Sequence, residues 1–243
     1  MNATGQYQFT IIVPLFNEKD NLEKLEKSLS AYLPRCSAQK AGVLFVDDGS
    51  TDEGTALLGE ICSRNEDFHF IRFAENCGLS AALKAGFELC QSPLVGYMDA
   101  DLQTDPEDFN ILLERMEGNA LVTGIRAKRN DSAVKKASSA FANSFRRMMT
   151  HDGAVDTGCP LKVMQTSYAK KLPLFKGMHR FIPALILMMG GTYEQIPVRH
   201  YPRTAGKSKY KLSNRLLGPL VDCFAYRWMK KRHSNFIIEQ SDL

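Results

Sequence analysis

The 243-residue chain carries a formal net charge of +4, with 44% hydrophobic and 24% charged residues, which excludes an intrinsically disordered protein and fits a globular one. Its longest mainly apolar stretch without a charge, Phe181–Tyr193, is too short to cross a bilayer, and the N-terminus lacks the basic, apolar start of an export signal. The six cysteines, at positions 36, 62, 77, 90, 159 and 223, form no Cys-x-x-Cys pair, so we expect reduced thiols in a cytoplasmic protein.

Residues 9–124 alternate short apolar runs with amphipathic helical patterns. The predicted strands are Phe9–Pro14, Val43–Val46, Phe68–Phe73, Leu94–Met98 and Ala120–Gly124. The predicted helices are Asp20–Leu33, a segment containing Ala56, Leu57, Leu58 and Ile61, then Leu79–Cys90 and Asp105–Met116. This alternation predicts an α/β fold with a mostly parallel central sheet that is flanked by helices. Such sheets bind ligands beyond the carboxyl ends of their strands.

After Gly124 the pattern changes. The predicted elements are a basic amphipathic helix at Asp131–Met149, a strand at Asp156–Met164, a helix at His179–Met189, a strand at Thr192–His200, a basic loop at 201–211 and a helix at Ser213–Arg232. The last helix has an apolar face formed by Leu216, Leu217, Leu220, Val221, Phe224 and Trp228. That face either packs on the sheet or lies on lipid, and the cationic run Lys230–His233 favours an interfacial helix beside anionic headgroups.

The small net charge conceals two halves of opposite sign. Residues 1–120 contain 9 Lys and Arg against 20 Asp and Glu, a net charge of −11, whereas residues 121–243 contain 22 against 7, a net charge of +15. An acidic half suits metal binding, and a basic half suits a phosphate-rich partner, an anionic membrane surface or nucleic acid.

Two alternate carboxylates follow the strand predicted at Leu94–Met98. Asp99 and Asp101 can converge on one divalent cation, and Gln103 supplies a neutral oxygen within reach. Mg²⁺ or Mn²⁺ prefers such oxygen ligands and can bridge to the phosphates of a nucleotide. The sequence therefore predicts a metal site at this strand end, although an isolated Asp-x-Asp is also common in solvated turns.

Adjacent carboxylates, Asp47 and Asp48, follow the strand predicted at Val43–Val46. Carboxylates can accept hydrogen bonds from a base edge or from ribose hydroxyls. A capped turn would account for Ser50, and for Asp52 as an alternative cap of the next helix, but not for the two adjacent carboxylates. Paired Asp residues at a strand end also occur in phospho-accepting receiver domains, so this motif alone leaves the function open.

The first predicted strand ends at Pro14, and Phe16 and Glu18 follow it. They complete a series of three strand-end motifs, VPLFNE, VDDGSTD and MDADLQ. In this order the motifs resemble the family 2 glycosyltransferases, whose nucleotide-binding fold is called GT-A. The resemblance implies that Pro14, Phe16, Glu18 and Asp47 or Asp48 line the base and ribose of a nucleotide sugar. It also implies that Asp99 faces the ribose or phosphates and that Asp101 and Gln103 hold Mg²⁺ or Mn²⁺.

The second half resembles the polyprenyl-phosphate glycosyltransferases, which include dolichol-phosphate mannose synthases and undecaprenyl-phosphate sugar transferases. The resemblance rests on four segments: Arg126 with Lys135, Ser139 and Asn143; Asp156–Lys162 (DTGCPLK); His179–Phe181 (HRF); and Arg203–Tyr210 (RTAGKSKY). It implies that Arg126, Lys135 and Ser139 bind the acceptor phosphate, with Arg146 as a further candidate, and that Arg203, Lys207 and Lys209 close over the donor pyrophosphate.

Together these resemblances imply an inverting transfer of sugar from GDP-mannose or a UDP-sugar to undecaprenyl or dolichyl phosphate, with Asp99, Asp101, Arg126 and Lys135 as catalytic residues. Because a phosphate oxygen is already ionised near neutral pH, no strong general base is needed. The implied partners are the nucleotide sugar, the lipid, the cytoplasmic face of a membrane and a small membrane protein, with no nucleic acid. We expect a GT-A domain at 1–210, divided into nucleotide-sugar (1–124) and acceptor (125–210) halves, and a membrane-facing or packing helix and tail at 211–243.

The sequence departs from its relatives at two of these positions. Lys135 stands where many relatives have Arg, which loses the bidentate contact with phosphate, and Phe16 replaces a common Tyr. Many bacterial relatives also continue into transmembrane helices, so either the chain is trimmed or the enzyme is monotopic.

Three other interpretations stay open. The first is a family 2 enzyme with a saccharide acceptor, which needs a carboxylate base, and Asp156 is the candidate. The second is a non-catalytic nucleotide-sugar-binding module. The third is nucleic-acid binding by the basic half, although no nucleic-acid motif is present.

Overall fold

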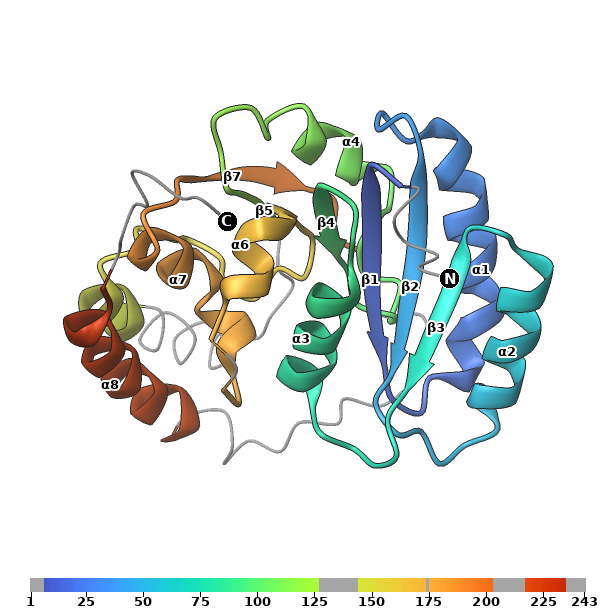
Figure 1. Ribbon diagram of the computed structural model, residues 1–243, viewed down its shortest axis with the longest axis horizontal. Coiled ribbons are helices and arrows are strands. Elements are labelled where there is room, and N and C mark those ends of the chain that lie inside the picture. The colour runs from blue at the N-terminus through green and yellow to red at the C-terminus, as the bar shows by residue number, and fades with distance from the viewer. Residues whose placement is uncertain (1–6, 127–143, 174, 203–216, 235–243) are drawn as a thin grey trace, which may run out of the picture.

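The computed structural model describes residues 7–126, 144–173, 175–202 and 217–234. Within these residues the strands form one seven-stranded sheet in the order β3-β2-β1-β4-β6-β5-β7 (Figure 1). The strands are β1 (Phe9–Leu15), β2 (Ala41–Asp47), β3 (Phe68–Arg72), β4 (Leu94–Tyr97), β5 (Leu121–Arg126), β6 (Lys162–Gln165) and β7 (Tyr193–Val198). All neighbours are parallel except β6, which runs antiparallel to both β4 and β5. The predicted α/β class is therefore confirmed.

Helices cover both faces of this sheet. They are α1 (Lys19–Tyr32), α2 (Gly54–Arg64), α3 (Leu79–Leu89), α4 (Asp108–Leu113), α6 (Thr166–Lys171), α7 (Ile182–Met188) and α8 (Leu217–Arg232), with 3₁₀ turns η2 (Leu33–Arg35) and η3 (Met178–Arg180) and a helical segment at 144–150. None of the helices in the described ranges is both long and apolar enough to cross a membrane.

Two hydrophobic cores lie on opposite faces of the sheet. One joins the sheet to α1, α2 and α4 and includes Leu25, Leu58 and Phe109. The other joins it to α3, α6, α7 and α8 and includes Phe87 and Tyr226. Both faces of β1 and β2 are buried, which explains why these strands are continuously apolar rather than alternating.

Most predicted elements of the first half are confirmed to within a few residues, but α4 is shorter than predicted. The prediction was Asp105–Met116, and the helix spans Asp108–Leu113. Backbone hydrogen bonds from Phe109 to Pro106 and from Met116 to Leu113 show that its flanks are three-residue turns rather than α-helix.

Two predicted elements of the second half are wrong in extent. The strand predicted at Asp156–Met164 begins only at Lys162, because residues 156–161 form a turn in which Gly158 donates its N–H to the Asp156 carboxylate. The helix predicted at His179–Met189 is divided into η3 and α7, and Pro183 lies in the first turn of α7, where its missing N–H costs no hydrogen bond.

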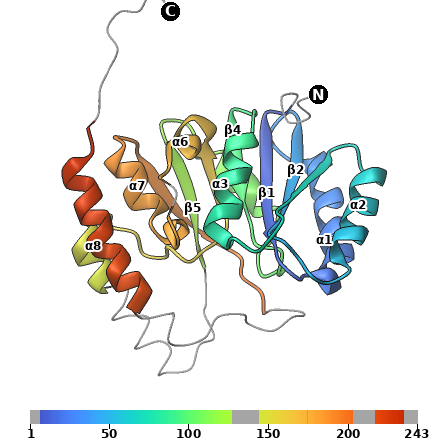
Figure 2. The same ribbon diagram turned by 60° about the horizontal axis from the view of Figure 1, so that its bottom comes forward.

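Helix α8 lies at the flank of the sheet farthest from α1 and α2 (Figure 2). It packs on the second core through Cys223 and Tyr226, and the Tyr226 ring stacks on Phe181 with centroids 6.2 Å apart. The predicted apolar face is not the packing face, because Val221, Phe224 and Trp228 are 66%, 61% and 62% exposed.

Candidate active site at the carboxyl edge of the sheet

The predicted strand-end motifs meet at one edge of the sheet. Because β1, β2, β4 and β5 run in the same direction, the ends of these strands and the residues that follow β1, β2 and β4 all lie there. They are Pro14, Phe16, Glu18, Asp47, Asp48, Asp99, Asp101, Gln103 and Arg126. The predicted residues Lys135, Ser139, Arg203, Lys207 and Lys209 lie outside the described residues.

The turns after β1 and β2 are tied together by Asn17. Its side-chain oxygen accepts the N–H of Thr51 at 2.8 Å and of Asp52 at 3.3 Å, and its own N–H is donated to Ser50 Oγ at 2.9 Å. The sequence suggested that Ser50 caps the next helix. Its hydroxyl oxygen instead accepts the N–H of Asn17, so this prediction is wrong. Asp52, the alternative candidate, accepts the N–H of Gly54, the first residue of α2.

The adjacent carboxylates Asp47 and Asp48 are held by different parts of the protein. Asp47 accepts the N–H of Ser50 at 2.9 Å and the hydroxyl of Thr55 at 2.6 Å. Asp48 accepts the N–H groups of Cys77 and Gly78, at 2.7 Å and 2.9 Å, in the turn that leads into α3. Both carboxylates thus shape the edge by fixing turns.

Gly49 lies in the turn after β2 and has φ of +70°. A Cβ on it would lie 2.5 Å from the backbone of Glu75. Only glycine fits this position without strain, so the turn after β2 and the segment before α3 are held in close contact. The contact brings the Asp48 carboxylate within reach of the N–H groups that it accepts.

The Asp-x-Asp segment follows β4 and contains a strained residue. Leu102 has φ of +58°, a conformation that costs a β-carbon-bearing residue on the order of 1–3 kcal/mol and that often marks functional sites. Asp101 is 7% exposed and accepts the N–H of Gln103 at 3.2 Å. Gln103 Nε2 donates to the Tyr201 carbonyl at 3.2 Å, which joins this segment to the end of β7.

Asp99 is half-buried beside Asp101. Burial raises the pKa of Asp99 to about 6, and the neighbouring Asp101 charge acts in the same direction. A hydrogen bond of 2.7 Å from the Tyr97 hydroxyl, together with the charges of Lys162 and Arg126, opposes this rise. The acidic motif after β4 is thus coupled to cations from β5 and β6.

Arg126, at the end of β5, forms a two-bond ion pair with Asp156. The distances from Nε to Oδ2 and from Nη2 to Oδ1 are both 2.8 Å. Burial opposes ionisation of Asp156, but Arg126 outweighs it and holds the pKa of Asp156 below its usual range. A Cβ on Gly158 would lie 2.7 Å from Arg126 Nη2, so any larger residue here would displace the guanidinium.

Arg146, a further candidate for the acceptor phosphate, is engaged elsewhere. It is 6% exposed and forms an ion pair with Asp152, and its Nη2 donates to the Ala154 carbonyl at 2.7 Å. Its charge is therefore neutralised within the protein, and we do not retain it as a phosphate ligand.

The residues present fit a divalent cation. Among the described residues no three His, Cys, Asp or Glu side chains cluster as a metal-binding group, so the protein ligands would be few, as is usual where nucleotide phosphates complete the coordination. His200, just after β7, carries a buried Nδ1 to which no described group hydrogen-bonds. Burial lowers the pKa of His200, and Arg126 acts in the same direction, whereas Asp101 raises it. A metal beside Asp101 would give this nitrogen a partner.

Sequence reasoning missed His200, Tyr97 and Lys162 as parts of this edge. His200 could have been found as an imidazole at the end of the last predicted strand. Lys162 ends one of the motifs that carry the resemblance, but its burial could not be predicted, because that depends on the antiparallel pairing of β6 with β4, which pairs Lys162 with Tyr97.

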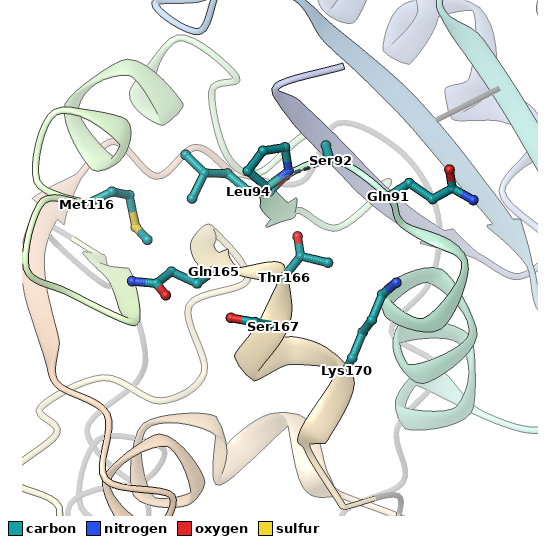
Figure 3. A pocket seen from close by; sticks show the side chains of 9 residues that line it. Gln91, Ser92, Leu94, Met116, Gln165, Thr166, Ser167 and Lys170 are labelled. Carbon is teal, nitrogen blue, oxygen red and sulfur yellow. Dashed lines mark hydrogen bonds between the residues drawn. The ribbon is translucent and has the colours of Figure 1, made fainter. Parts of the chain in front are cut away.

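A separate cavity of about 600 Å³ lies at the opposite edge of the sheet, beside the start of β4 and the end of β6 (Figure 3). Gln91, Ser92, Gln165, Thr166 and Lys170 are among the residues that line it. It is remote from the strand-end motifs and contributes none of the predicted site residues.

Comparisons with known proteins show which proteins this chain is similar to. The sequence profile named Glycosyl transferase family 2 matches residues 10–172. The chain is 29% identical to the dodecaprenyl-phosphate galacturonate synthase of Rhizobium johnstonii, over 94% of this chain and 70% of that protein. It is 33% identical to the undecaprenyl-phosphate 4-deoxy-4-formamido-L-arabinose transferase of Edwardsiella ictaluri, over 88% of this chain and 67% of that protein. The chain thus spans about two thirds of the length of these relatives.

Solved structures share the fold at low sequence identity. Glucosyl-3-phosphoglycerate synthase of Mycobacterium tuberculosis, in complex with Mn²⁺, UDP and glucosyl-3-phosphoglycerate, superposes with a TM-score of 0.69 at 15% identity, covering 96% of this chain and 83% of that one. A mannosyltransferase of Pyrobaculum calidifontis, in complex with GDP-mannose and Mn²⁺, gives a TM-score of 0.67 at 18% identity, covering 94% of this chain and 65% of that one. At these identities the likeness establishes the fold alone.

Proposed function

The chain belongs to glycosyl transferase family 2 and has the GT-A fold, and from that premise we propose that it is an inverting, metal-dependent enzyme that transfers a sugar from a nucleotide sugar to a polyprenyl phosphate. The names of the two relatives support the acceptor class, since both act with a polyprenyl phosphate. Solved structures with UDP or GDP-mannose and Mn²⁺ support a nucleotide-sugar donor and a divalent cation.

One observation carries the choice of a phosphate acceptor over a sugar hydroxyl. A hydroxyl acceptor needs a carboxylate base, and Asp156 is the candidate at this edge. Its two oxygens are engaged by Arg126, which also holds the pKa of Asp156 low, so it is a poor proton acceptor. A polyprenyl phosphate presents an oxygen that is already ionised, and attack by that oxygen requires positioning rather than deprotonation.

Each group at the edge then has a role on the donor side or the acceptor side. On the donor side, Pro14, Phe16 and Glu18 line the nucleotide, Asp47 and Asp48 hold the turns around it, and Asp99 orients its ribose or phosphates. Asp101 and Gln103, with His200, would hold Mg²⁺ or Mn²⁺, which supplies charge to neutralise the departing nucleoside diphosphate.

On the acceptor side, Nε and Nη2 of Arg126 are engaged by Asp156, so Nη1 is the donor that would bind the lipid phosphate. Lys135 and Ser139 complete that proposed subsite, and Arg203, Lys207 and Lys209 close over the donor pyrophosphate. These five residues lie outside the described ranges, and their roles rest on the sequence motifs.

The outer face of α8 supplies a surface for the membrane that holds such an acceptor. We define this outer face as Val221, Phe224 and Trp228, together with the exposed cations Arg227, Lys230, Lys231 and Arg232. The guanidinium of Arg232 lies 5.4 Å from the Trp228 ring centroid. An exposed apolar stripe with aromatic residues and flanking cations suits the headgroup region of an anionic bilayer. We place the enzyme at the cytoplasmic face of a membrane, where a small membrane protein is a further proposed partner.

The experiment that tests this function measures transfer of radiolabelled sugar from a panel of UDP- and GDP-sugars into organic-extractable lipid. The reaction contains polyprenyl phosphate, with and without Mn²⁺ or Mg²⁺. We expect metal-dependent label in the lipid phase with one donor. Nucleotide release without labelled lipid would exclude the polyprenyl phosphate acceptor and favour a saccharide acceptor.

If no donor is turned over but nucleotide sugars bind, the chain is a non-catalytic binding module. If neither occurs, a salt-dependent gel shift with nucleic acid tests the remaining interpretation of the basic half.

A further inference from the structure

Lys162 is a lysine buried at the candidate active site without a salt bridge. It begins β6, is 1% exposed and is among the largest fully buried side chains of the described residues. Its Nζ donates a hydrogen bond to the Cys159 carbonyl, and no described carboxylate lies within salt-bridge distance of it. A buried ammonium loses its hydration, so a lysine retained here calls for a compensating use of its charge.

The charge of Lys162 is directed at an aromatic ring rather than at a carboxylate. Lys162 and Tyr97 are direct partners in the antiparallel pairing of β6 and β4, so their side chains lie on the same face of the sheet. Nζ lies 5.6 Å from the centroid of the Tyr97 ring. A cation over a phenol ring draws electron density from it, which strengthens the hydroxyl as a hydrogen-bond donor.

The Tyr97 hydroxyl transmits this effect to the Asp-x-Asp motif. It donates to Asp99 Oδ1 at 2.7 Å, and Tyr97 itself is only 3% exposed. Three groups are therefore arranged in series: the buried ammonium, the phenol ring and the first carboxylate of the motif. The charges of Arg126 and Asp156 nearby are paired with each other. Lys162 is a buried cation without such a partner among the described residues, and its charge acts on the acidic motif.

We propose that Lys162 is a positioning residue that acts through Tyr97 to fix the orientation of Asp99 and so the affinity for the nucleotide of the donor. This inference rests on the proposed function, because it assigns Asp99 to the donor side. Lys162 does not touch the substrate, and its effect is on donor binding rather than on the acceptor phosphate.

The test uses Lys162→Met, which keeps the length of the side chain and removes its charge. Binding of UDP and of GDP, each with Mn²⁺, is measured by titration calorimetry, and thermal unfolding is recorded in parallel. We expect thermal stability to be kept or raised, because a buried charge is removed, while nucleotide affinity falls at least about 10-fold. In the transfer assay we expect a higher KM for the donor and an unchanged KM for the acceptor.

A double-mutant cycle tests the route through Tyr97. Tyr97→Phe removes the hydroxyl and keeps the ring, and Lys162→Met combined with Tyr97→Phe should bind nucleotide no more weakly than the worse single variant. Lys162→Arg, which keeps a cation, should retain affinity within about 3-fold. Lys84→Met is the control, since Lys84 is a largely buried lysine of α3 whose Nζ bonds to the Lys170 carbonyl and pairs with Glu88 at 3.3 Å, away from the Asp-x-Asp motif.

Unchanged nucleotide affinity in Lys162→Met would overturn the proposal, and so would fully additive losses in the double variant. If Lys162→Met does not fold, Lys162→Arg and Tyr97→Phe decide the question by the same binding measurement: normal affinity in Tyr97→Phe overturns the route. Failure of the wild-type protein to bind either nucleotide with Mn²⁺ would instead contradict the proposed function itself.

Discussion

Asp101 and Gln103 flank Leu102, whose positive φ turns the chain within the segment that follows β4. The strained turn lets the Gln103 N–H reach the Asp101 carboxylate and lets the Gln103 side chain reach Tyr201. A carboxylate and an amide oxygen are thus held together by backbone geometry, which reduces the reorganisation needed when a cation binds.

The first residue-scale prediction concerns Asp101. Asp101→Ala removes the proposed metal carboxylate, and we expect transferase activity to fall by at least about 100-fold together with the loss of measurable Mn²⁺ binding. Titration of the protein with Mn²⁺ in the presence of UDP or GDP measures the second effect. Asp105→Ala, four residues later, is the control, and metal-dependent turnover that survives in Asp101→Ala would contradict the assignment.

The second residue-scale prediction separates two roles of Asp156. If Asp156 only orients Arg126, Asp156→Asn keeps one hydrogen-bond acceptor and lowers activity by about 10-fold, mainly through a higher KM for the acceptor. Because the Arg126 pair holds the pKa of Asp156 low, we also expect the shape of the pH–rate profile to be unchanged. A loss of more than about 1000-fold in kcat would show a base instead.

The third residue-scale prediction concerns stability against pH at His179. Burial lowers the pKa of His179 to about 3, with Arg180 and Lys162 acting in the same direction. Ser80 Oγ accepts the N–H of Gly177, so its hydroxyl proton can be donated to His179 Nδ1 at 3.1 Å, which suits a neutral imidazole. Below about pH 6.5 the unfolded chain takes up a proton that the folded chain does not, so stability is present above that pH and is lost as the pH falls.

Urea unfolding at pH 8 and pH 5 measures this loss. Between pH 8 and pH 5, we expect the free energy of unfolding of the wild-type protein to fall by up to about 2 kcal/mol more than that of a His179→Gln variant. Equal pH dependence in the two proteins would show that His179 is protonated in the folded state.

At the scale of elements, α8 has a packing face and an exposed face. Cys223 and Tyr226 attach it to the second core, and the Tyr226 hydroxyl donates to the Ala184 carbonyl at 3.2 Å. The outer face is extended by the helical segment 144–150, in which Met148 is 59% exposed and Phe145 lies 6.4 Å from the Phe224 ring. The two helices therefore present one apolar surface that the described residues leave uncovered.

The element-scale prediction tests this surface. Replacing Phe224 and Trp228 with Ser should lower binding to vesicles that contain phosphatidylglycerol by at least about 10-fold, with thermal stability unchanged. Vesicle flotation measures the binding, and vesicles of phosphatidylcholine alone should bind weakly because the flanking cations then have no anionic partner. Leu89→Ser, an exposed apolar position at the end of α3, is the control. Undiminished binding in the double variant would exclude the outer face.

Elements were predictable where one local pattern determined them. The buried strands β1 and β2 were identifiable as continuous apolar runs, and α1 from Leu22, Leu25 and Leu29 at helical spacing. The strand β6 was not, because the apolar pattern of 156–164 does not reveal that Asp156 turns the chain to reach Arg126. The dual character of α8 was also hidden, since its packing face consists of Cys223 and Tyr226 rather than its strongest apolar residues.

At the scale of the whole molecule, the site could be located because parallel strands end at one edge. Three acidic motifs, each after a strand, were sufficient to bring Glu18, Asp47 and Asp101 to that edge. Sequence reasoning did not foresee that the Asp48 carboxylate would be engaged by its own protein, because its hydrogen bonds link segments about 30 residues apart. Long-range pairing likewise concealed the burial of Lys162 against Tyr97.

The position of β7 limits where the chain can be cut. The segment that defines the family ends at residue 172, yet β7, residues 193–198, pairs with the full length of β5 from Leu121 to Arg126. A fragment ending at 172 would leave β5 with an open row of peptide groups and would also remove the α7 side chains that bury one face of the sheet. We expect such a fragment to aggregate on expression, as light scattering would show, whereas one that extends through residue 202 should stay less aggregated. The segment by which the family is recognised is therefore shorter than the segment that completes the sheet.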